Sequence, residues 1–338
     1  MKKKKILCLL LSTVMLFAGC GNLENKKAKE TSLQVFAMDT YMTIKTYSDE
    51  EDNAAKAVAA EIYRLDAMLS TGSDTSVISD INKNGGGEVT EEISYLVEKS
   101  IELNKETDGA FDITIYPVMR AWGFTDENFR VPKKAELDAL LKNVDASLIV
   151  LEDNQIFLSE NQEIDLGGIA KGYTGQRAVE ILEEYNIKSA LLYLGGNIVC
   201  VGNKPNGEPW KIGIEDPEKN GNYLGAISVT DKSVVTSGGY ERYFEEDGIT
   251  YHHIIDPDTG YPAYNGLVSV TIVCTDGTKA DGLSTSLFIM GTDKAVSFWK
   301  EHSSEFDCVF YTEDGRLLVS EGLEDSFTSN YKYEIIEK

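Results

Sequence analysis

The sequence predicts an α+β fold with mainly antiparallel sheets flanked by helices. Residues 267–274 alternate in the manner of a strand, whereas residues 91–107 repeat apolar side chains at helical spacing. In the second half of the chain, short strand-like runs follow one another across turns, with few helices between them. Strands joined in this way pair with antiparallel neighbours.

The first twenty residues have the pattern of a bacterial lipoprotein signal. The basic residues Lys2 to Lys5 precede twelve largely apolar residues at 6–17, a run too short for a permanent membrane span. The following Ala18-Gly19-Cys20 resembles a lipobox, in which the cysteine is lipidated and becomes the mature N-terminus. The alternative is an ordinary signal peptide with a chance cysteine.

These features divide the chain into three predicted segments. Residues 1–19 form the signal peptide, residues 20–32 form a lipidated flexible tether, and residues 33–338 form the folded domain. Lipid on Cys20 would hold the protein at the extracytoplasmic face of the bacterial cell membrane.

The first half of the folded part mixes helices with short strands. Apolar periodicity, caps and turn residues define each element. We expect a strand at 34–47, a helix at 50–69, a short helix at 77–82, a flexible tip at 84–87, a helix at 91–107 capped by Thr90, a strand at 111–115, a loop at 118–124, a helix at 133–142, and a hairpin of 148–151 with 155–158.

The second half is richer in strands, and its helices are fewer. Helices are expected at 176–185, 280–290 and 294–302. Strands are expected at 189–194, 198–201, 210–214, 225–229, 233–237, 241–244, 252–255 and 267–274, with a closing hairpin of 306–311 and 316–320.

Charge and cysteine content narrow the classes of function. The net charge is −24, and the seven Lys and one Glu of residues 1–29 leave about −30 on the remainder. Such an acidic chain repels nucleic acid, so we expect no nucleic-acid partner. Cys200, Cys274 and Cys308 stand singly in apolar runs, which favours buried thiols over a metal site or a disulfide framework.

The run DLGGIAKGY at 165–173 has the composition of a phosphate-binding corner. Two adjacent glycines between a strand and a helix let the backbone approach a phosphate at the helix N-terminus. Lys171 would bring a positive charge to this corner, and Asp165 a carboxylate. Tight packing by the glycines is the alternative interpretation.

Asp281 and Thr285 are four residues apart on a predicted helix, so they share one face. A carboxylate and a hydroxyl, together with backbone carbonyls from a Gly-rich turn, suit Mg²⁺. Alternatively, Asp281 caps the helix and Thr285 packs. The adjacent His252 and His253 point to opposite faces of a strand, so at most one is expected to act as a base or an imidazole donor, and a zinc site is not expected.

Seven ordered motifs resemble the ApbE family, the FAD:protein FMN transferases. They are Met38-Asp39-Thr40, Phe111-Asp112-Ile113-Thr114 with Trp122-Gly123-Phe124, DLGGIAKGY, LGGN at 194–197, TSGGYERYF at 236–244, HHIIDP with TGYP at 252–262, and ADGLSTSLF at 280–288. The resemblance covers residues 33–320, and the lipobox also fits this family. Residues 33–338 are therefore identified as an ApbE-like flavin transferase domain.

The resemblance implies a Mg²⁺-dependent flavinyl transfer. Such an enzyme binds FAD as its substrate, cleaves the pyrophosphate, attaches FMN to a Thr or Ser hydroxyl of an acceptor protein and releases AMP. The acceptor would be a flavoprotein subunit of a membrane redox complex or a secreted lipoprotein. Phosphoryl transfer depends mainly on positioning and charge neutralisation, which Mg²⁺ and Lys171 would supply on this acidic chain.

The resemblance also assigns residues by position. Asp281 and Thr285, the Gly168 carbonyl and the adjacent Ser284 correspond to the metal site. His253 matches the functional histidine of the family, so His253 and Asp281 are the candidates for the base. The Trp122 loop would offer an aromatic surface for a flavin or adenine ring, and Arg242 is expected to support the fold. The implied FAD contacts are Met38, Gly72, Ala121, Trp122, Gly123, Phe124, Asp165, Lys171 and the backbone of Ile255.

Two other functions are compatible with parts of this pattern. An FAD pyrophosphatase would use the same magnesium corner with water in place of the acceptor. A flavin-binding lipoprotein would carry flavin or electrons without catalysis. A carrier needs no pair of metal ligands, so Asp281 and Thr285 favour an enzyme.

Overall fold

The computed structural model describes residues 28–48, 53–217 and 221–338. The predicted signal peptide and the lipidation site Cys20 lie outside these residues. The first strand, β1, begins at Lys29, so residues 29–32, which we expected in the tether, belong to the folded domain. In the part of the chain that the structure describes, no helix is both long and apolar enough to cross a membrane.

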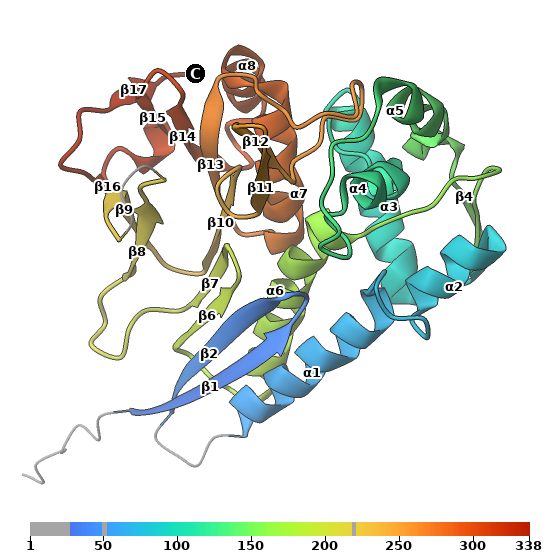
Figure 1. Ribbon diagram of the computed structural model, residues 1–338. Coiled ribbons are helices and arrows are strands. Elements are labelled where there is room, and N and C mark those ends of the chain that lie inside the picture. Colours follow the sequence, from blue (N-terminus) through green and yellow to red (C-terminus); the bar gives the residue numbers. More distant parts are fainter. Residues whose placement is uncertain (1–27, 49–52, 218–220) are drawn as a thin grey trace, which may run out of the picture.

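A nine-stranded sheet forms the centre of the fold (Figure 1). Neighbouring strands are antiparallel, as the sequence predicts, except at one edge, where the last pair is parallel. In spatial order the strands are β1 (Lys29–Ala37), β2 (Thr40–Ser48), β6 (Ala190–Leu194), β7 (Asn197–Val201), β10 (Lys232–Gly238), β13 (Leu267–Cys274), β14 (Asp307–Thr312), β15 (Leu317–Ser320) and β17 (Glu334–Ile336).

Helices cover one face of this sheet. The helices α1 (Ala54–Leu69) and α6 (Gly167–Glu184) share a hydrophobic cluster with β1, β2, β6 and β7. The helix α7 (Gly277–Met290) packs on β10 and β13, and α8 (Thr292–His302) packs beside β14. The α6 and α7 helices therefore lie side by side across the middle of the sheet.

A second, three-stranded sheet covers the opposite face. Its strands are β16 (Phe327–Thr328), β9 (Tyr223–Val229) and β8 (Trp210–Glu215). Side chains of β13 divide between the two faces: Ile272 packs in the cluster below the helices, and Val273 packs in the cluster below the small sheet. This burial on both faces explains why β13 is mostly apolar and why its two polar residues, Ser269 and Thr271, are also buried.

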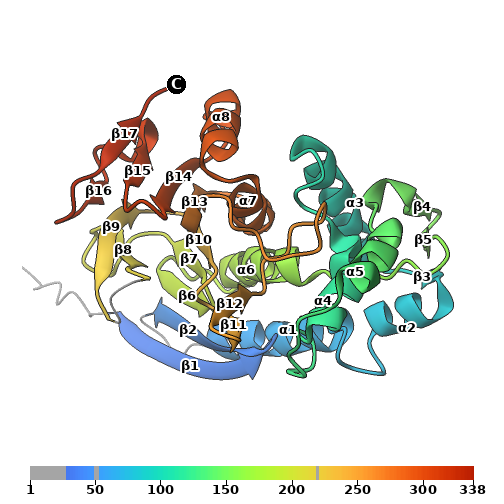
Figure 2. The same ribbon diagram turned by 45° about the horizontal axis from the view of Figure 1, so that its top comes forward.

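The remaining helices form a lobe that packs on α6 and α7, on the right in Figure 1. Figure 2 shows a two-stranded hairpin between this lobe and the large sheet. The lobe contains α2 (Val77–Asn84), α3 (Glu91–Glu106), α4 (Tyr116–Trp122), α5 (Lys134–Leu140) and a small sheet of β3 (Gly86–Glu88), β5 (Gln155–Phe157) and β4 (Val150–Glu152); the hairpin is β11 (Tyr243–Glu246) with β12 (Ile249–His252).

Two predictions about the first half were wrong. The expected strand at 34–47 is a hairpin, because Met38 and Asp39 both adopt left-handed backbone angles, with φ of 49° and 58°, and reverse the chain between β1 and β2. Most of the expected strand at 111–115 and loop at 118–124 is helical, because residues 113–122 form a 3₁₀ turn followed by α4. Here the Asp112 side chain accepts the Thr114 N–H at 2.7 Å and caps a short 3₁₀ turn that leads into α4, and Pro117 lies in the first turn of that helix.

Several boundaries also differ from the prediction, and three of these differences are the following. The helix expected at 176–185 begins nine residues earlier, at Gly167, whose N–H donates to the Asp165 side chain at 2.8 Å. The tip expected to be flexible at 84–87 pairs with β5. Residues 241–242 and 253–255 lie outside the short hairpin of β11 and β12.

Candidate active site

A cavity of about 210 Å³ lies where the first turn of α6 meets α7, β10 and the segment before α4. Its apolar lining includes Phe111, Ile113, Ile115, Met119, Ile254, Ile255 and Ile289. Its polar lining includes Asp165, Lys171, Asn197, Thr236, Ser237, Glu241, Arg242, His253, Asp281 and Thr285. The apolar side chains of the cavity can therefore pack against a ring system of a ligand, and its polar side chains can contact charged groups of the same ligand.

The close crossing of α6 and α7 positions Asp281. The Gly172 N–H on α6 donates to Asp281 Oδ2 on α7 at 2.7 Å. A Cβ atom at Gly172 would lie 2.7 Å from the Asp281 Cβ, so only glycine allows the helices to come this close. Burial raises the pKa of the Asp281 carboxyl, and the positive charge of Lys171 opposes this shift. The glycines of the DLGGIAKGY motif thus include one with a packing role.

The predicted metal site is partly assembled. Asp281 and Thr285 both line the cavity from one face of α7, and Gly168 lines it from α6. Gly168 lies in the first turn of α6, and its carbonyl oxygen has two lone pairs, so it can accept a helical hydrogen bond and still contact a cation. One carboxylate, one hydroxyl and one carbonyl are hard oxygen donors, which fits Mg²⁺ with several retained waters.

Ser284 does not fit this donor set. Its side chain is fully buried, its Oγ lies 2.7 Å from Ser237 Oγ, and its hydroxyl donates to the Asp281 carbonyl at 2.8 Å. It ties α7 to β10 and is not a lining residue of the cavity. Among the residues that the structure describes, no group of three His, Cys, Asp or Glu side chains could hold a metal, so hydroxyl and carbonyl oxygens would have to complete the site.

The two histidines have different environments, as the sequence predicted, although β12 ends at His252 and His253 follows the strand. His253 lines the cavity, and its Nδ1 lies 3.1 Å from the Arg242 carbonyl. A carbonyl only accepts, so Nδ1 carries the proton and Nε2 holds the lone pair. Burial, with the nearby charges of Arg242 and Lys171, lowers the pKa of His253 to about 3. His252 is buried outside the cavity, where Nε2 donates to the Ala263 carbonyl at 3.0 Å.

The implied FAD contacts divide into two groups. Asp165, Lys171 and Ile255 line the cavity. The others lie outside its lining: Met38 is in the β1–β2 turn, Gly72 is in the exposed loop after α1, and Ala121, Trp122, Gly123 and Phe124 belong to the end of α4. The structure therefore brings only part of this set together.

Trp122 does not present the aromatic surface that we expected. Its side chain is fully buried, and its Nε1 donates to the Gly260 carbonyl at 2.8 Å. The β11–β12 hairpin covers the ring through Phe244 and Tyr251, whose centroids lie 6.2 Å and 5.3 Å from it. Trp122 therefore packs beneath the lining residues of the cavity and does not contact the cavity itself.

Several cavity residues were missed by the sequence assignment. Asn197 belongs to the LGGN motif, and Thr236, Ser237, Glu241 and Arg242 belong to TSGGYERYF, so the motifs were recognised without a role for these side chains. Arg242 does support the fold, because its Nη2 donates to the Phe124 carbonyl at 2.6 Å, but it also lines the cavity. Desolvation by the surrounding cavity residues raises the pKa of Glu241 to about 7, although the residue as a whole is exposed to solvent.

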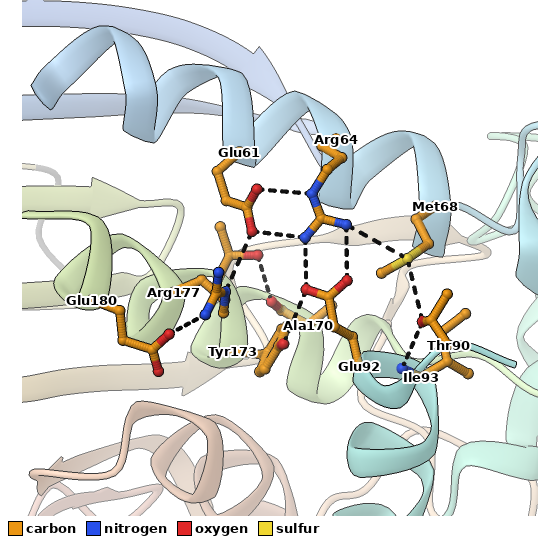
Figure 3. A network of polar contacts seen from close by, with 11 residues as sticks. Glu61, Arg64, Met68, Thr90, Glu92, Ile93, Ala170, Tyr173, Arg177 and Glu180 are labelled. Atoms are coloured by element: carbon orange, nitrogen blue, oxygen red, sulfur yellow. Dashed lines mark hydrogen bonds and ion pairs between the residues drawn. The ribbon is translucent and has the colours of Figure 1, made fainter. Parts of the chain in front are cut away.

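A network of charged side chains connects α6 to α1 and α3 (Figure 3). Arg64 on α1 makes paired hydrogen bonds to Glu92 on α3, at 2.6 Å and 2.8 Å, and to Glu61 at 2.7 Å and 2.8 Å. The Tyr173 hydroxyl on α6 donates to the same Glu92 carboxylate at 3.2 Å. Tyr173 directly follows Gly172, so the network fixes the helix turn that contacts Asp281.

Comparisons with known proteins agree on one family. The ApbE family model matches residues 38–310. A curated relative from Klebsiella pneumoniae, named FAD:protein FMN transferase, is 32% identical over 86% of this chain and 91% of its own length. A relative of the same name from Treponema pallidum is 31% identical over 92% of this chain and 93% of its own length.

Solved structures give the same result. The crystal structure of the ApbE protein from Thermotoga maritima matches with a TM-score of 0.83 and 35% identity, covering 88% of this chain and 99% of that one. The flavin transferase ApbE from Vibrio cholerae matches with a TM-score of 0.80 and 27% identity over the same shares. The motifs, the α+β fold and these matches agree, and the chain belongs to the ApbE family.

Proposed function

We propose that this chain transfers the FMN half of FAD to a Thr or Ser hydroxyl of an acceptor protein and releases AMP. One observation carries this proposal: Asp281, Lys171 and His253, from three separate segments, meet in one cavity that also has apolar walls. The curated relatives named above bear the name of this activity. An extracytoplasmic flavoprotein is the acceptor class that we expect.

The proposed reaction forms one bond and breaks one. The acceptor oxygen attacks the phosphorus of the FMN phosphate, the bond from that phosphorus to the oxygen bridging to AMP breaks, and AMP leaves with the bond's electron pair. The hydroxyl proton passes to a base on the enzyme. Lys171 and Arg242 both line the cavity and supply positive charge toward a pyrophosphate.

A divalent cation fits the same corner. Asp281, Thr285 and the Gly168 carbonyl would hold Mg²⁺, and Ser284, whose hydroxyl is otherwise engaged, would not. When bound, Mg²⁺ would neutralise charge on the pyrophosphate oxygens. The orientation of the Asp281 carboxylate does not depend on the metal, because the Gly172 N–H donates a hydrogen bond to it.

His253 is the better supported candidate for the base. Its Nδ1–H is held by the Arg242 carbonyl, which leaves the Nε2 lone pair as acceptor. The ring is neutral in the free enzyme, because its pKa is lowered to about 3. An anionic substrate in the cavity offsets the charges of Arg242 and Lys171 and raises the proton affinity of the ring. Asp281 is already engaged by the Gly172 N–H.

Intact mass spectrometry tests the activity. The chain without residues 1–27 is incubated with FAD, Mg²⁺ and a candidate acceptor carrying a Ser-Gly-Ala-Thr segment. An acceptor heavier by one FMN, with AMP released, is the expected result. FMN and AMP without labelling would favour an FAD pyrophosphatase, and unchanged FAD bound to the protein would favour a carrier.

We further propose that the protein is anchored by lipid on Cys20 at the extracytoplasmic face of the cell membrane. The basic, apolar and lipobox-like segments of residues 1–20 support this proposal. Radiolabelled palmitate should label the wild type in the membrane fraction. Cys20→Ala should lose the label, and equal labelling of both proteins would contradict the assignment.

A further inference from the structure

The LGGN motif forms part of a rim made of three turns. The Gly195-Gly196 turn between β6 and β7 packs against the β1–β2 turn, because a Cβ atom at Gly195 would lie 2.5 Å from the Thr40 side chain. It also packs against the segment after β10, since a Cβ atom at Gly196 would lie 3.5 Å from Glu241 Oε1. The Thr236 N–H donates to the Gly196 carbonyl at 3.1 Å. We call these three turns the rim.

Two polar groups of the rim line the cavity without a hydrogen-bond partner in the described structure. The Asn197 side chain is 2% exposed, and its Nδ2 has no partner. This amide is close enough to Asp281 to favour that carboxylate's charge, but the geometry does not make a hydrogen bond. A buried donor without a partner destabilises the folded state, and a ligand that accepts its hydrogen bond would offset this effect.

Glu241 supplies the complementary acceptor. Its carboxylate lines the cavity, and within the described residues it forms no hydrogen bond or ion pair, although Lys171 attracts it. Asp281 and Glu215 repel it. A carboxylate in this position is unsuited to a pyrophosphate, because like charges disfavour each other. Its natural partner is an N–H donor.

A donor and an acceptor that line the same cavity match the main chain of a polypeptide, which offers one C=O and one N–H per residue. We propose that Asn197 and Glu241 bind the main chain of the acceptor segment, next to the hydroxyl that receives FMN. This inference rests on the proposed function and assigns the acceptor side of the same cavity. FAD would then occupy the side with Lys171, Arg242 and the apolar wall.

Exposed aromatic rings extend the rim outward. Phe36 and Tyr41 flank the β1–β2 turn, their ring centroids are 5.0 Å apart, and Tyr41 is 80% exposed. Asp39, in the same turn, is close enough to Asp165 in the cavity to influence the charge of its carboxyl. These rings offer apolar contact for residues on either side of the acceptor hydroxyl.

The test separates acceptor binding from FAD binding. Asn197→Ala, Glu241→Ala and Glu241→Gln are compared with wild type, and Glu245→Ala on β11 is the control for loss of an exposed carboxylate. The protein acceptor carries a Ser-Gly-Ala-Thr segment. Its KM and kcat come from the FMN-labelling rate, and the Kd of FAD comes from flavin fluorescence without acceptor.

We expect Asn197→Ala and Glu241→Ala to raise the acceptor KM about tenfold, as loss of one hydrogen bond predicts. Glu241→Gln, which keeps an acceptor oxygen, should recover part of this loss, and the Kd of FAD should change less than threefold in each variant. A larger effect on FAD than on the acceptor, or no effect on either, would overturn the inference while leaving the proposed function intact. A wild type that releases AMP but labels no acceptor would overturn both.

Discussion

Gly172 and Asp281 join α6 to α7 through a hydrogen bond of 2.7 Å from the backbone N–H of one to the carboxylate of the other. The same contact closes the helix crossing and fixes the carboxylate that faces the cavity. Helix packing and site geometry are therefore coupled at this point, and a change in one should appear in the other.

Gly172→Ala tests this coupling directly. The added Cβ would lie 2.7 Å from the Asp281 Cβ, so the helices must separate. Overpacking of this kind costs about 1–3 kcal/mol. Urea unfolding should show that loss of stability, and the FMN-transfer rate should fall with it. Gly72→Ala is the stability control, because its Cβ would meet only the Ser70 hydroxyl at 3.7 Å; equal destabilisation by both changes would contradict the crossing argument.

Asp281→Asn should abolish FMN transfer, because it removes the only carboxylate of the proposed magnesium corner. The fold should persist, because the neutral Asn side chain removes the cost of burying a negative charge. Burial raises the pKa of the Asp281 carboxyl, which shows that this cost exists. Thermal unfolding supplies the second measurement: Mg²⁺ should stabilise the wild type and not the variant. Chelation of the metal should stop transfer by the wild type. A variant that keeps both its activity and its response to Mg²⁺ would exclude Asp281 as a ligand.

The pH dependence of folding stability should show the contribution of the raised pKa of Glu241. Its folded pKa is raised from 4.5 to about 7, so the folded state binds more protons than the unfolded state between these values. Stability of the free enzyme should therefore fall as pH rises from about 4.5 to about 7. Urea unfolding at pH 5 and pH 7 measures the difference. Glu241→Gln should flatten the profile over this range, and an unchanged slope would show that other groups cause it.

Arg64→Met should loosen α6 by breaking the paired bonds to Glu61 and Glu92. Arg64 is 45% exposed and the pairs are near the surface, so the expected cost is about 1 kcal/mol. Hydrogen exchange should show the local effect, with faster exchange at Lys171 and Gly172 than in wild type. Lys134→Met, which breaks an exposed pair with Asp138 on α5, is the control and should leave α6 exchange unchanged.

The sequence predicted those parts of the site that depend on local periodicity. Asp281 and Thr285 share a helix face, and His252 and His253 have different environments as predicted, although only His252 lies on a strand. The roles of Asn197 and Glu241 depend on turns that are distant in sequence and meet only in the fold. Trp122 was misread because the β11–β12 hairpin, more than a hundred residues later, covers its ring.

The two adjacent histidines should fail in different ways when each is replaced by Ala. His252 is buried, its ring donates to the Ala263 carbonyl and its Nδ1 accepts the Ile254 N–H at 3.3 Å, so His252→Ala should destabilise the fold by about 1–3 kcal/mol.

His253→Ala should instead slow FMN transfer, because it removes the Nε2 acceptor in the cavity. The folded pKa of His253 lies below its ordinary value of 6.5, so the neutral ring contributes stability above pH 6.5 that is lost as pH falls toward about 3. The loss of wild-type stability over this range should therefore be smaller in His253→Ala. Single-turnover labelling and urea unfolding distinguish the two roles. Equal rates of transfer in the two variants, at equal folded fraction, would remove the basis for choosing His253 as the base.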